Sequence, residues 1–173
     1  MSTSFYDLSV GSFLQTVSGM QRVLTKGAEF AKDNNIDPDT FVSLKIHDTM
    51  LPMLFQVACV PMHSVAALEA IKGGVFTPPK KMEPSDYQGL IDMVNKAHEQ
   101  LSAYSEEEIN ALAGKPVLFK MDSMEIPFTA ENFVMSFSLP NLNFHAATAY
   151  DLLRAQGVAL EKIDFLGKMR IGI

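Results

Sequence analysis

Apolar residues recur every three or four positions along the first part of the chain, which is the spacing of one face of an α-helix. Residues 10–31 carry this pattern without a break, with Phe13, Val17 and Leu24 among the apolar positions. Asn34 and Asn35 follow the last of them and are typical of a helix end. The pattern therefore predicts a long first helix.

A second helical region follows, but two prolines interrupt it. It opens at Asp37-Pro38, where a carboxylate can accept the free amide protons of a helix start and proline needs no donor. Helical spacing continues to Ile71, yet Pro52 and Pro61 each remove a backbone N–H. We expect a break or kink near Pro52, a kink at Pro61, and a Pro- and Gly-rich loop over residues 74–84.

Capping signals mark the next two helices. Ser85 with Gln88 resembles a capping box in front of helical spacing that extends to Leu101. Ser105 with Glu108 repeats the signal before a shorter segment that ends near residue 114. The sequence thus predicts a third long helix and a short one after it.

The pattern changes between residues 116 and 129, where apolar positions surround an Asp-Ser pair at 122–123. This spacing predicts a two-stranded hairpin or another ordered excursion. Thr129 can cap a segment over residues 130–138, and Pro140 can open a fourth long helix that ends at Gly157. Residues 161–173 have no clear helical period, and we expect them to form a tail that packs across the helices.

Four long amphipathic helices predict an all-α fold, namely a four-helix bundle with a short β-hairpin or extended insertion before the last helix and a docked C-terminal tail. A chain of 173 residues is long enough to bury a sizeable core, and we see no linker, so residues 1–173 are expected to form a single domain. The long connection before Ser85 also permits a topology other than up-down-up-down.

Charge and cysteine content narrow the classes of partner. Fourteen basic and twenty acidic residues give a net charge of −6, which repels phosphate backbones and anionic lipid surfaces, so we expect neither nucleic acid nor a membrane as partner. The single cysteine, Cys59, allows no internal disulfide, and the first residues do not resemble a secretion signal. Both features predict a cytoplasmic location.

Polar residues on apolar helix faces are the candidates for chemistry, because helical bundles build their sites from facing helices. Gln56 and His63 are seven residues apart and so share one side of a helix. Asn141 and His145 are related by four residues on the last long helix, beside small alanines that leave room for a cavity. We therefore expect a small polar pocket lined by Gln56, His63, Asn141 and His145.

Each of these residues also has a purely structural interpretation. A single histidine on a helix is often only a partner of a backbone carbonyl, and we interpret His98 in this way. His47 lies about half a turn around the helix from Gln56 and joins the pocket only if Pro52 redirects the chain. Apolar neighbours favour an inert, packed Cys59. The motifs of P-loop, Rossmann, nucleophile-elbow and HExxH enzymes do not occur.

Several segments together resemble an uncharacterised bacterial family, a domain of unknown function within the DinB/YfiT-like superfamily. They are Phe5-Tyr6-Asp7, the segment MLFQVA at residues 53–58, and above all LPNLNFHAATAYDLLRAQGVALEKIDFLG at residues 139–167, where Glu161 stands at a position for which we expect glycine. The resemblance extends over nearly the whole chain. It implies a DinB-like four-helix bundle and a homodimer, but no particular reaction.

The resemblance also implies a possible divalent metal, zinc or nickel. Members of the superfamily commonly bind a metal through one histidine on the second helix and two on the fourth, spaced by four residues. Here His145 matches one of the fourth-helix pair, while Asn141 and Ala149 stand four residues before and after it. Gln56 matches the second-helix position, and His63 is the residue that can compensate, so His145 and His63 are the expected metal ligands.

Two functional hypotheses follow. The first is an altered metal-dependent enzyme with a pocket between the second and fourth helices, because the superfamily includes thiol-dependent transferases and isomerases. The alternative is a non-catalytic, dimeric ligand-binding or stress-related protein, whose polar core residues only hold the helices in register. Both hypotheses allow a small-molecule ligand, and the sequence alone does not decide whether the protein is an enzyme.

Overall fold

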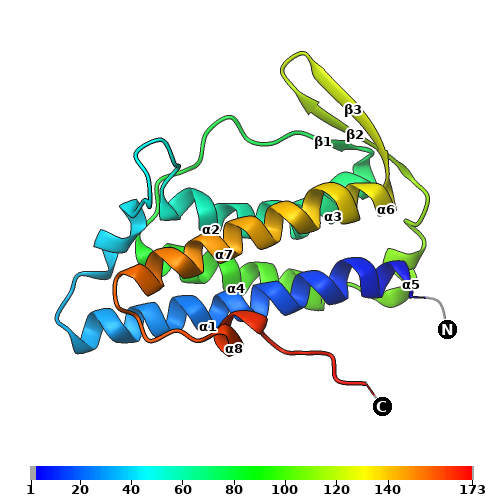
Figure 1. Ribbon diagram of the computed structural model, residues 1–173. Helices are drawn as coiled ribbons and strands as arrows, with labels where there is room; N and C mark the ends of the chain where they lie inside the picture. Colours follow the sequence, from blue (N-terminus) through cyan, green and yellow to red (C-terminus); the bar gives the residue numbers. More distant parts are fainter. Residues whose placement is uncertain (1–2, 173) are drawn as a thin grey trace.

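Long helices packed side by side form the body of the protein (Figure 1). The structure is a computed structural model and describes residues 3–172. Helix α1 (Ser12–Asp33) contacts α4 (Tyr87–Ser102) and α7 (Leu139–Ala155), and α2 (Met53–Met62) contacts α4 and α7 from the other side. Helix α3 (Val65–Gly73) follows α2 after a bend and leads to the end of the bundle where the strands lie. The predicted helical bundle is confirmed.

The second helical region is more broken than its spacing predicts. A short 3-10 helix, η2 (Pro38–Ser43), follows the Asp37 cap, and residues 44–52 are not helical, because α2 begins only after Pro52. Helices α2 and α3 meet at a bend of 43°, just after Pro61. The prolines thus act at the expected places, but Pro52 ends a non-helical segment instead of bending a continuous helix.

The capping predictions for the next helices are partly correct. Asp86, not Ser85, caps α4, because its carboxylate accepts a hydrogen bond from the backbone N–H of Gly89. Ser105 caps α5 (Glu106–Asn110) as expected, by accepting from the N–H of Glu108. Helix α5 ends at Asn110 and is followed by turns up to residue 114.

A small sheet covers one end of the bundle. Strands β2 (Pro116–Met121) and β3 (Met124–Thr129) form the predicted antiparallel hairpin, and Asp122 takes a positive φ of 52° at its turn. Strand β1 (Val75–Phe76) pairs in parallel with β2, which places Phe76 beside Phe119. The sequence did not indicate β1, because two residues after a helix are too short for a periodic signal.

The last long helix is extended at its N-terminal end. Thr129 caps α6 (Ala130–Phe133) by accepting from the N–H of Asn132, as predicted. A short π-helix, η3 (Val134–Ser138), joins α6 to α7. A second π-helix, η1 (Asp7–Gly11), precedes α1. Pro140 lies in the first turn of α7, where proline is tolerated.

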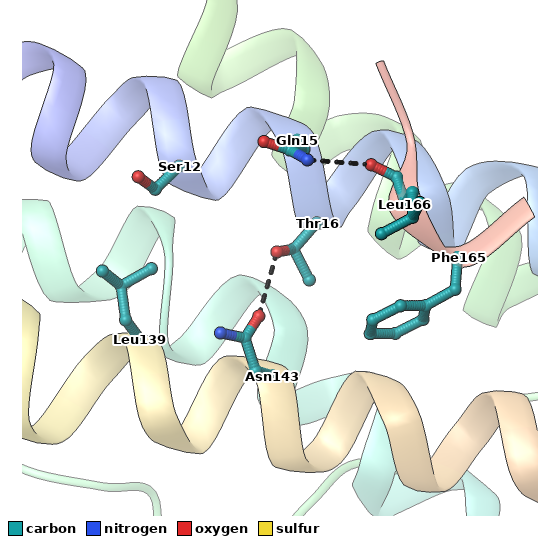
Figure 2. Close-up of a pocket in the computed structure, with 7 residues that line it drawn as sticks. All are labelled: Ser12, Gln15, Thr16, Leu139, Asn143, Phe165 and Leu166. Atoms are coloured by element: carbon teal, nitrogen blue, oxygen red, sulfur yellow. Dashed lines mark hydrogen bonds between the residues drawn. The ribbon is translucent and has the colours of Figure 1, made fainter. Parts of the chain in front are cut away.

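The C-terminal tail is docked, and it contains a short helix that its sequence pattern does not reveal. Helix α8 (Lys162–Leu166) packs against α1, where the carboxylate of Asp164 lies 2.8 Å from the ammonium group of Lys26. The side-chain amide of Gln15 donates to the carbonyl oxygen of Leu166 (Figure 2). Gly19 on α1 allows α8 to approach this closely, because a Cβ atom at position 19 would lie 2.2 Å from the carbonyl oxygen of Phe165.

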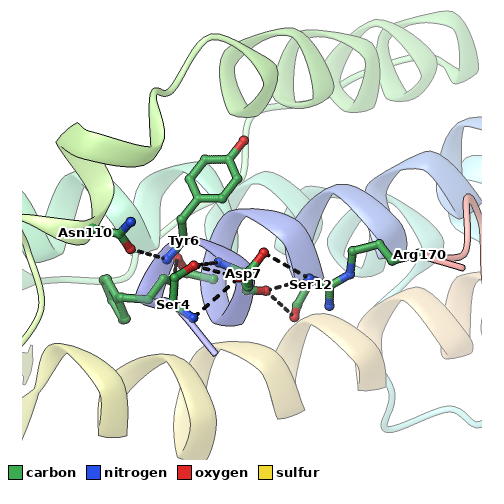
Figure 3. Close-up of polar contacts among 8 residues, drawn as sticks. Ser4, Tyr6, Asp7, Ser12, Asn110 and Arg170 are labelled. Carbon is green, nitrogen blue, oxygen red and sulfur yellow. Dashed lines mark hydrogen bonds and ion pairs between the residues drawn. The ribbon is translucent and has the colours of Figure 1, made fainter. Parts of the chain in front are cut away.

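Polar contacts tie the end of the tail to the start of the chain (Figure 3). The guanidinium group of Arg170 donates to the carbonyl oxygen of Asp7, and the hydroxyl of Ser4 donates to the carboxylate of Asp7. The backbone N–H of Tyr6 donates to the side chain of Asn110. The Arg170 contact thus joins the tail to the segment before α1, and the Tyr6 contact joins that segment to the end of α5.

The apolar faces of the long helices meet in one continuous core. Within the described residues, no single helix is long and apolar enough to cross a membrane, although α2 and α3 together reach that length and composition across their bend.

Candidate metal centre

Three side chains from α2 and its C-terminal end face one side chain from α7. Gln56, Cys59 and His63 follow one another at intervals of three and four residues, so they share one face. His63 caps the end of α2, and its backbone N–H still donates to the carbonyl oxygen of Cys59 over 2.9 Å. Because α2 packs against α7, this face meets His145.

A hydrogen bond between the two helices fixes the protonation pattern of His145. Its Nδ1 lies 2.7 Å from Oε1 of Gln56, and Nε2 of Gln56 donates to the carbonyl oxygen of Leu51 over 2.8 Å. Because the Gln56 amide nitrogen is used by Leu51, the oxygen faces His145 and can only accept. The neutral imidazole of His145 therefore carries its proton on Nδ1 and keeps its lone pair on Nε2.

His63 is buried beside this pair. It is 5% exposed, and its ring stacks on that of His145 with 5.9 Å between centroids and 8° between planes. Its Nδ1 has no hydrogen-bond partner among residues 3–172. A buried polar atom without a partner costs about 1–3 kcal/mol, which favours a ligand at this position.

Burial keeps both imidazoles neutral. It lowers the pKa of His63 from 6.5 to about 4, to which the proximity of His145 also contributes, and it lowers the pKa of His145. At neutral pH both rings are therefore in the form that binds metal ions.

Cys59 completes a group of three metal-binding side chains. One possible ligand atom from each of Cys59, His63 and His145 lies within 4.8 Å of the other two. Tetrahedral zinc, bound at about 2.0–2.3 Å by nitrogen and sulfur, holds its ligands roughly 3–4 Å apart, so small side-chain shifts would close the group around an ion. Burial raises the pKa of the Cys59 thiol to about 12, so without a metal it stays protonated at neutral pH.

The group opens onto a cavity of about 220 Å³. Residues of α2 and its C-terminal cap, β1, the connection after β1, β2, η3 and α7 surround it, and most of them are apolar. The lining residues other than Cys59, His63 and His145 are Phe55, Met62, Phe76, Pro78, Pro79, Met82, Phe119, Met121, Phe137 and Asn141.

The structure brings together three of the four residues expected from the sequence. Gln56, His63 and His145 converge, but the cavity is lined by His63, His145 and Asn141 and not by Gln56. The side-chain amide of Asn141 donates to the carbonyl oxygen of Phe137. His47 lies apart from them, exposed in the non-helical segment and hydrogen-bonded to Thr49. The role of these residues in binding stays a prediction.

Cys59 is the residue that the sequence analysis set aside. Its apolar neighbours favoured inert packing, and they do bury it, yet its side chain lies within reach of both histidines. The available signal was the spacing of four residues between Cys59 and His63, which places two metal-binding side chains on adjacent turns of one helix face. His98 is half-buried and lines a separate pocket beside the tail.

Comparison with known proteins agrees with the fold. A crystal structure of a DinB family member protein from Shewanella denitrificans superimposes with a TM-score of 0.79 over 97% of this chain and 94% of that one, at 22% sequence identity. No curated protein matches the chain. The model of the family described as domain of unknown function (DUF1993) matches residues 5–166, and the chain therefore belongs to the DUF1993 family.

Proposed function

We propose that Cys59, His63 and His145 bind one divalent transition metal ion and that this ion is the functional centre of the protein. The observation that carries the proposal is the approach of the three side chains to within 4.8 Å, inside the core and beside a cavity. One sulfur and two imidazole nitrogens form a donor set that suits zinc, and nickel is the second candidate.

The neighbouring residues support metal binding. Gln56 accepts the Nδ1 proton of His145, as the second partner of a metal-binding histidine usually does, and leaves Nε2 free for the ion. His63 offers a buried nitrogen without a partner. Cys59 would bind as a thiolate, so each ion that enters releases the thiol proton.

Three protein ligands leave the fourth position of a tetrahedral ion open. Structural zinc sites usually have four protein ligands, whereas catalytic sites keep one position for water or substrate. An ion at this position would supply Lewis-acid chemistry to a molecule in the cavity. We therefore favour a metal-dependent enzyme over a purely structural metal site.

The test is metal content and metal-dependent stability of protein purified without a histidine tag. Wild-type protein is expected to retain about one zinc or nickel ion per chain after dialysis, and the added metal should raise its melting temperature because it binds the native state. Cys59→Ala and His145→Ala should each abolish the gain. His47→Ala is the matched control, since His47 is exposed and outside the group. This variant should keep the metal-dependent gain in melting temperature.

The Gln56–His145 hydrogen bond favours a second candidate, a non-catalytic ligand-binding protein in which this pair only fixes the position of α7 against α2. In that case, His145→Ala should destabilise the metal-free protein by about 1–3 kcal/mol, because the buried Gln56 oxygen loses its donor. Added metal would then change the melting temperature of neither protein.

A further inference from the structure

The cavity beside the Cys59, His63 and His145 group is lined mainly by apolar side chains. Four phenylalanines, three methionines and two prolines form most of its lining. Phe76, Phe119 and Phe137 pack against one another with ring centroids 5.2–6.1 Å apart, so this part of the wall is a rigid aromatic surface.

Among residues 3–172, no charged side chain lines the cavity. Lys80 and Lys81 belong to the same connection as Pro79, and both are exposed and line a neighbouring pocket instead of this cavity. The side chain of Lys80 is 91% exposed and its ammonium group lies 3.7 Å from the carboxylate of Asp122 at the hairpin turn. In the metal-free protein, a carboxylate or phosphate group inside the cavity would therefore have no cation among the lining side chains to offset its desolvation.

The polar atoms of the lining come from a few neutral groups on α2, its C-terminal cap and α7. They are Cys59, His63, His145 and Asn141. Within the described residues Nδ1 of His63 has no hydrogen-bond partner, and the Asn141 amide nitrogen donates to the carbonyl oxygen of Phe137. A matching ligand has an apolar body and one neutral polar end.

We propose that this cavity binds an uncharged aromatic molecule of one ring that carries a single neutral hydrogen-bonding group, such as a hydroxyl or carbonyl. The size agrees, because a cavity of about 150 Å³ holds benzene and this one measures about 220 Å³. The apolar body lies against Phe76, Phe119 and Phe137, and the polar end faces the histidines and Asn141. This inference deepens the proposed function, since the polar end is next to the metal position.

Matched probes of one size test the inference. Benzyl alcohol, toluene and benzoate differ mainly in the group attached to the ring, and their binding is measured by ligand-observed NMR and calorimetry on metal-free protein kept in a chelator. We expect benzyl alcohol to bind most tightly, toluene to bind more weakly, and benzoate to bind more than about tenfold more weakly than benzyl alcohol, because a buried carboxylate lacks a partner.

Cavity variants show whether the probes bind at this place. Met62→Trp adds volume to the wall and should abolish binding of benzyl alcohol. Met93→Trp, at a half-buried methionine of α4 outside the lining, is the matched control and should bind as the wild type does. Asn141→Leu should reduce the preference for benzyl alcohol over toluene, which keeps the test valid if Met62→Trp does not fold.

Three results would overturn the inference: benzoate binding as tightly as benzyl alcohol, no binding of benzyl alcohol at millimolar concentration, or binding that a folded Met62→Trp variant retains. Because the probes are measured without metal, binding of benzyl alcohol by a protein that takes up no zinc would refute only the metal proposal. Zinc uptake without probe binding would refute only the ligand class.

Discussion

Acidification of the metal-free protein should remove stability before the carboxylates titrate. Burial holds the pKa of His63 at about 4 in the folded protein, against 6.5 for an exposed histidine. The unfolded chain therefore binds more protons than the folded one between these values, and stability falls as the pH falls. The contribution of His63 is fully present above pH 6.5 and is lost progressively toward pH 4.

The size of the effect follows from the same two values. At about 1.4 kcal/mol per pH unit, the difference between 6.5 and about 4 corresponds to a loss of about 3 kcal/mol. His145 adds to the loss, because burial also lowers its pKa. Asp164 acts only at lower pH: burial opposes its ionisation, but hydrogen bonds from Lys26 and from the Glu161 backbone hold its pKa below the usual value.

Urea unfolding in the presence of a chelator, at several pH values between about 4.5 and 7, measures this loss. His63→Phe should flatten the curve, because phenylalanine takes up no proton and can pack among Phe76 and Phe137. His47→Gln, which changes an exposed imidazole, is the control and should follow the wild type. Equal slopes for the wild type and His63→Phe would refute the reasoning.

Three further predictions concern metal uptake, the tail and assembly. Zinc affinity should rise about tenfold per pH unit near neutrality, because Cys59 must lose its proton, and Cys59→Ala should remove most of this slope in calorimetry. Asp164→Asn should lower the free energy of unfolding by about 1–2 kcal/mol in urea titrations, since its buried carboxylate binds both Lys26 and the backbone N–H of Glu161, whereas exposed Lys162→Ala should have little effect. We also propose a homodimer, for which light scattering should give about twice the chain mass; Phe144, 61% exposed on α7, is a candidate contact, and a clean monomer at micromolar concentration would contradict the proposal.

The fold was predictable from the sequence where the helices are amphipathic. Helices α1, α4 and α7 each turn one apolar face to the core. The apolar positions of each face recur over enough turns for the helical period to be recognised in the sequence. Residues 44–52 were assigned wrongly because apolar Leu44 and Leu51 fit a helical spacing, although in the structure Leu44 is half-buried and Leu51 is exposed. Helix α8 was missed for the opposite reason: a five-residue helix with its own capping box has no room for a periodic pattern.

The pocket was harder to predict, because it depends on how two helices face each other. The sequence shows that Gln56 and His63 share a side of one helix and that His145 borders an apolar row on another. Only the packing of α2 on α7 brings Gln56 within 2.7 Å of His145, and this contact assigns the glutamine a role beside the histidine instead of on the metal. The resemblance alone could not distinguish a glutamine that binds the metal from one that holds the histidine.

The proposed ligand set also explains why the interrupted pair on the last helix need not abolish metal binding. Resemblance implies two ligands four residues apart on that helix, yet Ala149 and Asn141 occupy both positions around His145. The same spacing of four residues occurs instead between Cys59 and His63 at the end of α2. Two adjacent turns of α2 then supply two ligands and α7 supplies one, so the number of donors is kept while the helix that carries the pair changes. This exchange replaces an imidazole by a thiolate, which would reduce the net charge at the ion and favour zinc over harder metals.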